Sequence, residues 1–315
     1  MMGLLQLAAR HGRAALVMGL LTGLLLPDLA ARLQPWLPHM VAALLFLNAY
    51  RIGYSRAVGG LRDGLDTLCA VALLQLALPL LALAGAALLG LAETPAALTL
   101  VLMLSAPSVT GSPNITALLG HPPETAFRLL ILGTALMPLT VIPVFLLMPG
   151  LGAIDHLADV LRAAGRLVAT IGLVVLAGFL LRRLTLPNLR PDQATAIDGL
   201  TMIALAVIVV ALMSALGPAL EQQPWLVLQW MGFALAANLG LQMLTYAVVR
   251  RRAGSGAVAV SVVAGNRNFA LFLIALPAAT TEPLLIFLGC YQVPMYLTAI
   301  LMRRFYSRAA VSSER

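Results

Sequence analysis

Ten apolar runs, separated by short polar segments, occupy almost the whole chain and constrain its fold most strongly. A helix needs about 20 predominantly apolar residues to cross a bilayer. The chain is 61% hydrophobic and 10% charged, against about 25% charged residues in a typical soluble domain. We therefore predict an all-α polytopic membrane protein with ten transmembrane helices. The runs are Ala14–Ala30, Leu37–Ile52, Leu65–Leu91, Ala96–Leu119, Ala126–Met148, Leu161–Leu181, Ala196–Leu216, Trp225–Val249, Ala257–Leu276 and Leu284–Met302.

The arginines give the predicted orientation. All 20 basic residues are arginines, and the formal net charge is +8. With the N-terminus inside, sixteen arginines fall in inside segments, three fall in outside segments, and Arg267 lies within a run. This asymmetry predicts a multi-pass protein of the cell inner (plasma) membrane with both termini cytoplasmic. The arginines flank apolar runs, so the partner they indicate is the lipid bilayer and not a nucleic acid.

The fourth run is interrupted by residues that break a helix. Between Ser105 and Thr116 lie two prolines, Pro107 and Pro113, one glycine and six hydroxyl or amide side chains. Each proline lacks a backbone donor and frees a carbonyl upstream. Interrupted backbone persists at membrane depth only where it faces protein or a water-filled cavity.

The ninth run is interrupted in the same manner. Apolar sequence leads into Gly265, Asn266, Arg267 and Asn268 and then resumes. A guanidinium at the bilayer centre costs at least about 2.5 kcal/mol on insertion scales, so it almost always faces a cavity or a partner.

The two interruptions lie about half the chain apart, each in the fourth of five runs. An odd number of spans in each half predicts inverted repeats, at about 1–150 and 151–315, with a binding site where the broken helices meet. The candidate substrate-binding residues are Thr110, Ser112, Asn114, Thr116, Asn266, Arg267 and Asn268.

At these residues the chain resembles the bile acid:sodium symporter family, as a bacterial homologue with altered sodium-site residues. The Pro107–Asn114 segment is similar to the family's Pro-Gly-Gly-Thr-Ala-Ser-Asn break, although Ser108 and Val109 replace its glycines. Gln75 with Pro79 resembles the Gln and Pro of the family's third span. The segment Val263–Asn268 resembles its Glu-Val-Gly-Met-Gln-Asn break and matches it at Gly265 and Asn268.

The resemblance implies a ten-helix fold. A panel of spans one, two, six and seven lies beside a core of spans three to five and eight to ten. It also implies transport of small organic anions, in many members with sodium. The ion-site region carried over residue by residue is Gln75, Ser112, Asn114, Thr134, Thr140, Val263 and Arg267.

Two departures from the family pattern concern sodium. Val263 stands where the family has a glutamate, and Arg267 replaces the neighbouring glutamine. At an effective dielectric of about 20, a guanidinium 4 Å from a sodium ion would repel it by roughly 4 kcal/mol. We therefore expect weakened or absent sodium dependence and no cofactor.

Three roles remain open for Arg267. It takes the place of sodium by donating to carbonyls freed by Pro107 and Pro113 or to Thr110, Ser112 or Asn114. Alternatively it binds an anionic substrate directly, or it pairs with Glu282.

Other polar residues have less specific expectations. Asn48, Asn238 and Gln242 are expected to hydrogen-bond between helices. Asp198 is placed at the membrane interface, with a cavity position as the alternative. Cys69 and Cys290 are expected to be buried thiols, and the four scattered histidines predict no metal site.

The leading function is a secondary active transporter of a small organic anion. The alternatives are an arsenite-type or other efflux carrier of the same fold, or a membrane sensor that binds without transporting. An enzyme is not expected, because paired aspartate clusters or a placed Ser–His pair are missing from the sequence. A monomer and a homodimer both remain open.

Overall fold

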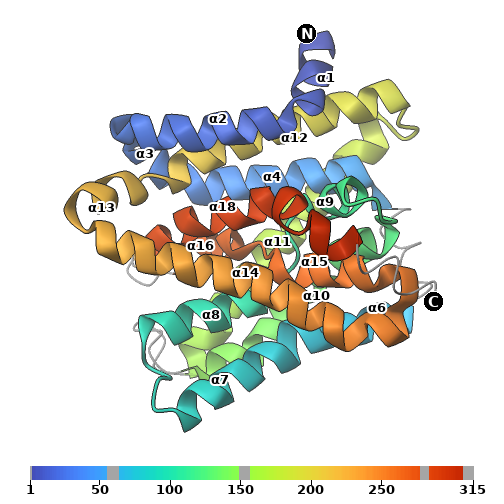
Figure 1. The fold of residues 1–315 in the computed structure, drawn as a ribbon. Helices are drawn as coiled ribbons and strands as arrows, with labels where there is room; N and C mark the ends of the chain where they lie inside the picture. The colour runs from blue at the N-terminus through green and yellow to red at the C-terminus, as the bar shows by residue number, and fades with distance from the viewer. Residues whose placement is uncertain (1, 55–63, 149–156, 277–283, 308–315) are drawn as a thin grey trace. The chain divides into compact units, whose positions relative to one another are not determined.

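The computed structural model describes residues 2–54, 64–148, 157–276 and 284–307. The described residues are 87% helical and contain no named strand (Figure 1). Their contacts divide into two compact units, built from described residues within 1–59, 165–228 and 270–289 and within 60–164, 229–269 and 290–315.

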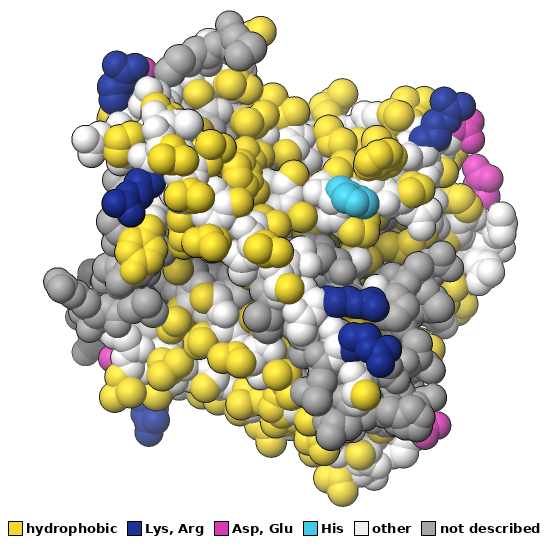
Figure 2. All heavy atoms as spheres, turned by 180° about the vertical axis from the view of Figure 1, so that it is seen from behind, with side chains coloured by type: hydrophobic (Ala, Val, Ile, Leu, Met, Phe, Trp, Pro, Cys, Tyr) yellow, Lys and Arg dark blue, Asp and Glu magenta, His cyan; other side chains and the backbone are white. Residues whose placement is uncertain are grey.

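Within the described residues, five helices are long and apolar enough to cross a membrane, at Gly64–Leu88, Glu124–Leu147, Pro191–Gln222, Pro224–Ala253 and Leu285–Ser307. A bent pair, Ala14–Leu25 with Pro27–Ile52, raises the number to six if it counts as one span. Many large hydrophobic side chains are exposed, among them Leu88 at 89%, and Figure 2 shows hydrophobic side chains over much of one described face. These properties fit a polytopic membrane protein.

The first unit contains the helices of the first two predicted runs and most of those of the sixth and seventh. Its elements are α1 (Met2–Arg10), α2 (Gly12–Leu25), α3 (Pro27–Leu33), η1 (Gln34–Trp36), α4 (Leu37–Ile52), most of α11 (Leu157–Thr185), α12 (Pro191–Leu212), α13 (Leu216–Gln222) and α16 (Phe272–Ala275). Pro27 follows the end of α2, and the chain turns there by 105°.

Helix α12 is the centre of the first unit and packs against α1, α2, α3 and α4. Gly199 lets α12 approach α1 closely, because a Cβ at this position would collide with the backbone carbonyl of Leu5 on α1. The unit is therefore held by helix packing with at least one contact that requires glycine.

The second unit contains the interrupted fourth run and the ninth run as far as Phe269. Its elements are α6 (Gly64–Ala72), the π-helical segment η2 (Leu73–Ala77), α7 (Leu78–Leu88), α8 (Pro95–Ser105), α9 (Ser112–Leu118), α10 (Glu124–Leu147), most of α14 (Pro224–Ala253), η3 (Gly254–Gly256), α15 (Ala257–Gly265) and most of α18 (Leu285–Leu301). The 3₁₀ turn η4 (Phe269–Leu271) lies at the boundary between the units.

The core of the second unit is an apolar cluster formed by α6, η2, α10 and α15. Its buried residues include Val71, Leu129, Leu132, Val260 and Val263. A second cluster joins α15 to the segment that follows α18 through Val258, Val262, Met302 and Tyr306. These clusters hold α15 against its neighbours up to the residue at which the helix breaks.

The two cysteines differ in environment. Cys290 on α18 is buried, as expected, but Cys69 is exposed. The prediction that Cys69 is buried is wrong, because this position lies on the outward side of α6, beside the exposed Leu65 and Leu68.

Candidate functional site

The fourth predicted run is two helices with an unwound segment between them. Helix α8 begins at Pro95 and is capped by Thr94, whose hydroxyl accepts from the Ala97 amide. It ends at Ser105, and Ala106 takes an extended conformation (φ −70°, ψ 150°), as the residue before a proline prefers. The chain becomes helical again at Ser112.

The ninth predicted run is interrupted too. Helix α15 ends at Gly265, and Asn266 leaves the helical conformation (φ −111°, ψ 87°). Gly265 is required by close packing, because a Cβ there would collide with the Asn238 carbonyl and the Gln242 side chain of α14.

The two unwound segments meet within the second unit. The Val109 amide donates to the Asn266 carbonyl at 2.9 Å, and the Asn268 amide donates to the Pro107 carbonyl at 2.7 Å. Ser108 and Arg267 thereby form an isolated antiparallel bridge. We call the segments Pro107–Val109 and Asn266–Asn268 the crossing.

Arg267 is 1% exposed and lies at the crossing. Its guanidinium donates to three backbone carbonyls: Ala264 at 2.9 Å from Nε, Ala106 at 3.1 Å from Nη1 and Leu74 at 3.2 Å from Nη2. The Ala106 carbonyl directly precedes Pro107, but the carbonyl that the missing Pro107 amide would leave free in a helix is that of Met103, so the predicted acceptor is not the one observed. None of the three is a side chain of Thr110, Ser112 or Asn114, and Glu282 lies outside the described residues.

Tyr291 on α18 also supports the crossing, a role that no sequence pattern predicted. Its hydroxyl accepts from the Arg267 amide at 3.0 Å and donates to the Gly265 carbonyl. Tyr291 comes 24 residues after Arg267, and no local pattern connects the two.

A buried polar network surrounds Asn266. The Asn238 side-chain amide donates to the Asn266 side-chain oxygen at 3.2 Å and to the Gly265 carbonyl. Gln242 donates to Asn238 at 2.8 Å, and Thr298 lies 3.1 Å from the Asn266 oxygen. Asn238 and Gln242 therefore hydrogen-bond between segments, as predicted, and Thr298 joins them from α18.

The predicted residues after Pro107 have different environments. Ser112 and Thr116 are buried, Thr110 is half-buried and Asn114 is exposed. Thr116 donates to the Ser112 carbonyl of its own helix at 2.9 Å. The Ser112 hydroxyl is buried and has no hydrogen-bond partner among the described residues. Asn268, on the opposite segment, is half-buried.

The remaining members of the predicted ion-site region lie on η2 and α10. Gln75 is 2% exposed, and its side-chain oxygen lies 3.4 Å from the Thr140 hydroxyl. Thr140 also donates to the Met137 carbonyl at 3.2 Å, and Thr134 is half-buried. Gln75 and Thr140 thus lie together, and their role in ion binding stays a prediction.

These residues do not fit a bound sodium ion. Val263 is buried in the apolar cluster, and the guanidinium of Arg267 takes three freed carbonyls. The described carboxylates of the second unit, Asp66, Glu93 and Glu124, are all exposed. A hard cation favours several oxygen ligands, usually with a carboxylate among them, and the described part of the crossing supplies no carboxylate.

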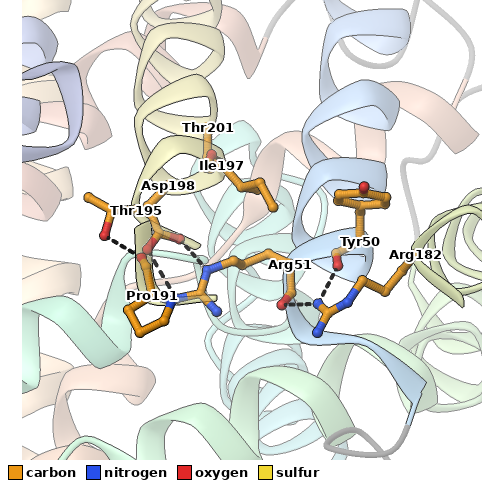
Figure 3. Close-up of polar contacts among 8 residues, drawn as sticks. All are labelled: Tyr50, Arg51, Arg182, Pro191, Thr195, Ile197, Asp198 and Thr201. Carbon is orange, nitrogen blue, oxygen red and sulfur yellow. Dashed lines mark hydrogen bonds and ion pairs between the residues drawn. The ribbon is translucent and has the colours of Figure 1, made fainter. Parts of the chain in front are cut away.

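Asp198 belongs to the first unit and is bound to Arg51 (Figure 3). Arg51 Nε and Nη2 donate to the two carboxylate oxygens of Asp198 at 2.7 and 3.1 Å. Asp198 is 46% exposed, which agrees with the interfacial placement. Arg182 on α11 donates to the Tyr50 and Arg51 carbonyls at 2.9 Å each, so it caps the C-terminal end of α4.

Comparison with known proteins gives no further guidance. No family model matches the chain, and no curated protein matches it.

Proposed function

We propose that the protein is a secondary transporter that carries a small organic anion across the membrane. The observation that carries this proposal is the pair of broken helices joined at the crossing. Helices α8 and α15 have 11 and 9 residues, about half of what a bilayer span needs. Secondary transporters place their binding sites near the membrane midplane, where discontinuous helices meet.

The division of the chain's contacts into two compact units favours transport over binding without transport. Alternating access is largely the movement of one rigid part of a transporter against another. The chain's contacts divide into two compact units, and all residues of the crossing lie in the second one. A protein with one indivisible core would offer no such body to move.

Arg267 supports an anionic substrate. Arginine stays protonated in proteins, and no described carboxylate pairs with this one. The partial charges of helix ends act only over about one turn, whereas a full charge acts farther. With this charge offset by the two helix ends, the crossing carries no net negative charge that would exclude an anionic solute.

Ser112 is the best-placed group for substrate contact. Its hydroxyl is buried without a partner among the described residues, and a buried polar atom in this state usually has a functional explanation. Thr110 and Asn268, both half-buried, are the further candidates. The side chains of Asn266 and Arg267 are engaged in hydrogen bonds, and we assign them to holding the crossing.

Flux measurements on purified protein in liposomes test the proposal. We expect saturable uptake of at least one member of a panel of carboxylates, sulfonates and steroid acids. Ser112→Ala removes one substrate hydrogen bond, so the apparent KM rises by about 3- to 10-fold. Its thermal stability stays unchanged, because this hydroxyl has no described partner to lose.

Ser105→Ala is the matched control. The Ser105 hydroxyl is also buried but donates to the Val101 carbonyl of its own helix, so its removal leaves KM unchanged. Binding of a panel member without any flux would instead favour a membrane sensor. Neither binding nor flux with any panel member would overturn the proposal.

A further inference from the structure

The three carbonyls that receive the Arg267 guanidinium were each freed by a separate interruption of a helix. The first interruption is the π-helical segment η2, in which the Leu78 amide donates to the Leu73 carbonyl. The same spacing would direct the amide of residue 79 to the Leu74 carbonyl, but residue 79 is a proline and has no N–H. The Leu74 carbonyl is therefore left for Arg267.

The other two carbonyls lie at the ends of α8 and α15. In a continuous helix the Ala264 carbonyl would accept from Asn268, but that amide donates across the crossing to Pro107. The Ala106 carbonyl directly follows the last residue of α8, and the chain beyond it is unwound. Each of these three carbonyls is thus available because the regular α-helical hydrogen-bond pattern is interrupted at its position.

The charges at this point nearly balance. The C-terminus of a helix is equivalent to about −0.5 elementary charge, so the ends of α8 and α15 together offset about one positive charge. One guanidinium lies there, and its planar donors reach acceptors from three different elements. The arrangement has the shape and charge of a site for a single monovalent cation.

We infer that the Leu74, Ala106 and Ala264 carbonyls form a cation site that the chain fills permanently with its own side chain. The crossing therefore binds no free inorganic cation. If the proposed transport function holds, it follows that substrate movement is not coupled to sodium. The site itself does not depend on that function.

Thermal unfolding of the purified protein in detergent tests the site without any substrate. Arg267→Ala leaves three buried carbonyls without a donor, and we expect the apparent melting temperature to fall by about 5–10 °C. Guanidinium chloride at millimolar concentration, far below denaturing levels, fills the vacated site and restores at least half of this loss. Urea at the same concentration has a similar planar shape but no charge, and it restores nothing.

Arg182→Ala is the matched control variant. Arg182 also donates to three backbone carbonyls, those of Tyr50, Arg51 and Leu186, but in the first unit. Arg182 is also buried, but its acceptors Tyr50 and Arg51 lie at the end of a single helix, α4, whose partial charge of about −0.5 is half of that offered by the two helix ends at the crossing. Guanidinium should therefore not stabilise this variant.

Further measurements keep the inference open to refutation if Arg267→Ala does not fold. Arg267→Lys keeps the charge but lacks the planar fork, so its melting temperature should lie below that of the wild type. The wild type itself should melt at the same temperature in sodium and in choline. A sodium-dependent rise in the wild type, an Arg267→Ala variant as stable as the wild type, or equal rescue by urea would each overturn the inference.

Flux measurements distinguish a failure of the cation-site inference from a failure of the proposed transport function. Uptake that persists after sodium is replaced by choline agrees with both, and uptake that requires sodium refutes the permanently filled site. An absence of all uptake refutes the transporter, whereas the unfolding results still decide whether the site exists.

Discussion

Single buried polar residues hold the crossing together. Asn238, Gln242, Asn266 and Thr298 are all fully buried and bonded to one another. An unpaired polar group in a bilayer interior is costly, so these residues act as a set. They come from α14, α18 and the unwound end of α15, and they fix where that end lies.

Asn238→Ala tests this network. The change removes a donor to the Gly265 carbonyl and to Asn266, and we expect a loss of about 1–2 kcal/mol in unfolding free energy. Denaturant unfolding in detergent measures it. Gln229→Ala on the same helix is the control, because Gln229 is exposed. Equal losses in the two variants would contradict the network's role.

Sequence reasoning identified Arg267 as a buried cation in need of partners but not which partners it has. The Leu74 carbonyl becomes free only because a π-helical segment precedes Pro79, and proline in a helix does not by itself indicate that hydrogen-bond pattern. Tyr291 lies on another helix, and its proximity depends on the tertiary fold. A local sequence pattern therefore could not identify hydrogen-bond partners that only tertiary packing brings together.

At the scale of elements, the two interruptions were the most predictable features. Prolines with clustered hydroxyl residues mark the break in the fourth run, and a glycine followed by amide and arginine side chains marks the break in the ninth. The structure has unwound backbone at both places. The pairing of Ser108 with Arg267 was not predictable, because a two-residue bridge has no sequence signature. The sequence located the breaks, and packing determined their register.

A pair of glycines tests the contact between α14 and α15. Gly265→Ala inserts a Cβ against α14 and should cost about 1–3 kcal/mol, as overpacking usually does. Gly240→Ala on α14 meets no atom within 4 Å and should be neutral or stabilising by up to about 1 kcal/mol. Denaturant unfolding distinguishes them, and a harmless Gly265→Ala would show that the two helices are not in close contact.

At the scale of the whole molecule, ten runs were predicted, and five helices among the described residues are both long and apolar enough to span a membrane, or six with the bent pair. The difference arises largely where predicted spans are not single helices. The fourth run is divided into α8 and α9, the ninth is broken after α15, and the first two are joined by a bend. Length alone does not register an interrupted span, so the ten-span topology stays a prediction.

Single cysteines test this topology in a Cys69→Ser, Cys290→Ser background. Glu93→Cys and Glu221→Cys lie in predicted outside segments, and Arg190→Cys and Ser307→Cys lie in inside segments; all four positions are exposed. With both termini cytoplasmic, a membrane-impermeant thiol reagent added to intact cells should label only the first pair. Labelling of any inside position would refute the predicted alternation.

The bonds that join the two unwound segments run between main-chain groups, which every residue except proline can supply in full. These two bonds therefore do not depend on the side chain of Asn268, nor on those of Thr110 and Ser112 that follow the joint. Cargo preference and structural integrity become separable traits, and directed evolution can search Thr110, Ser112 and Asn268 for new specificities without first rebuilding the scaffold.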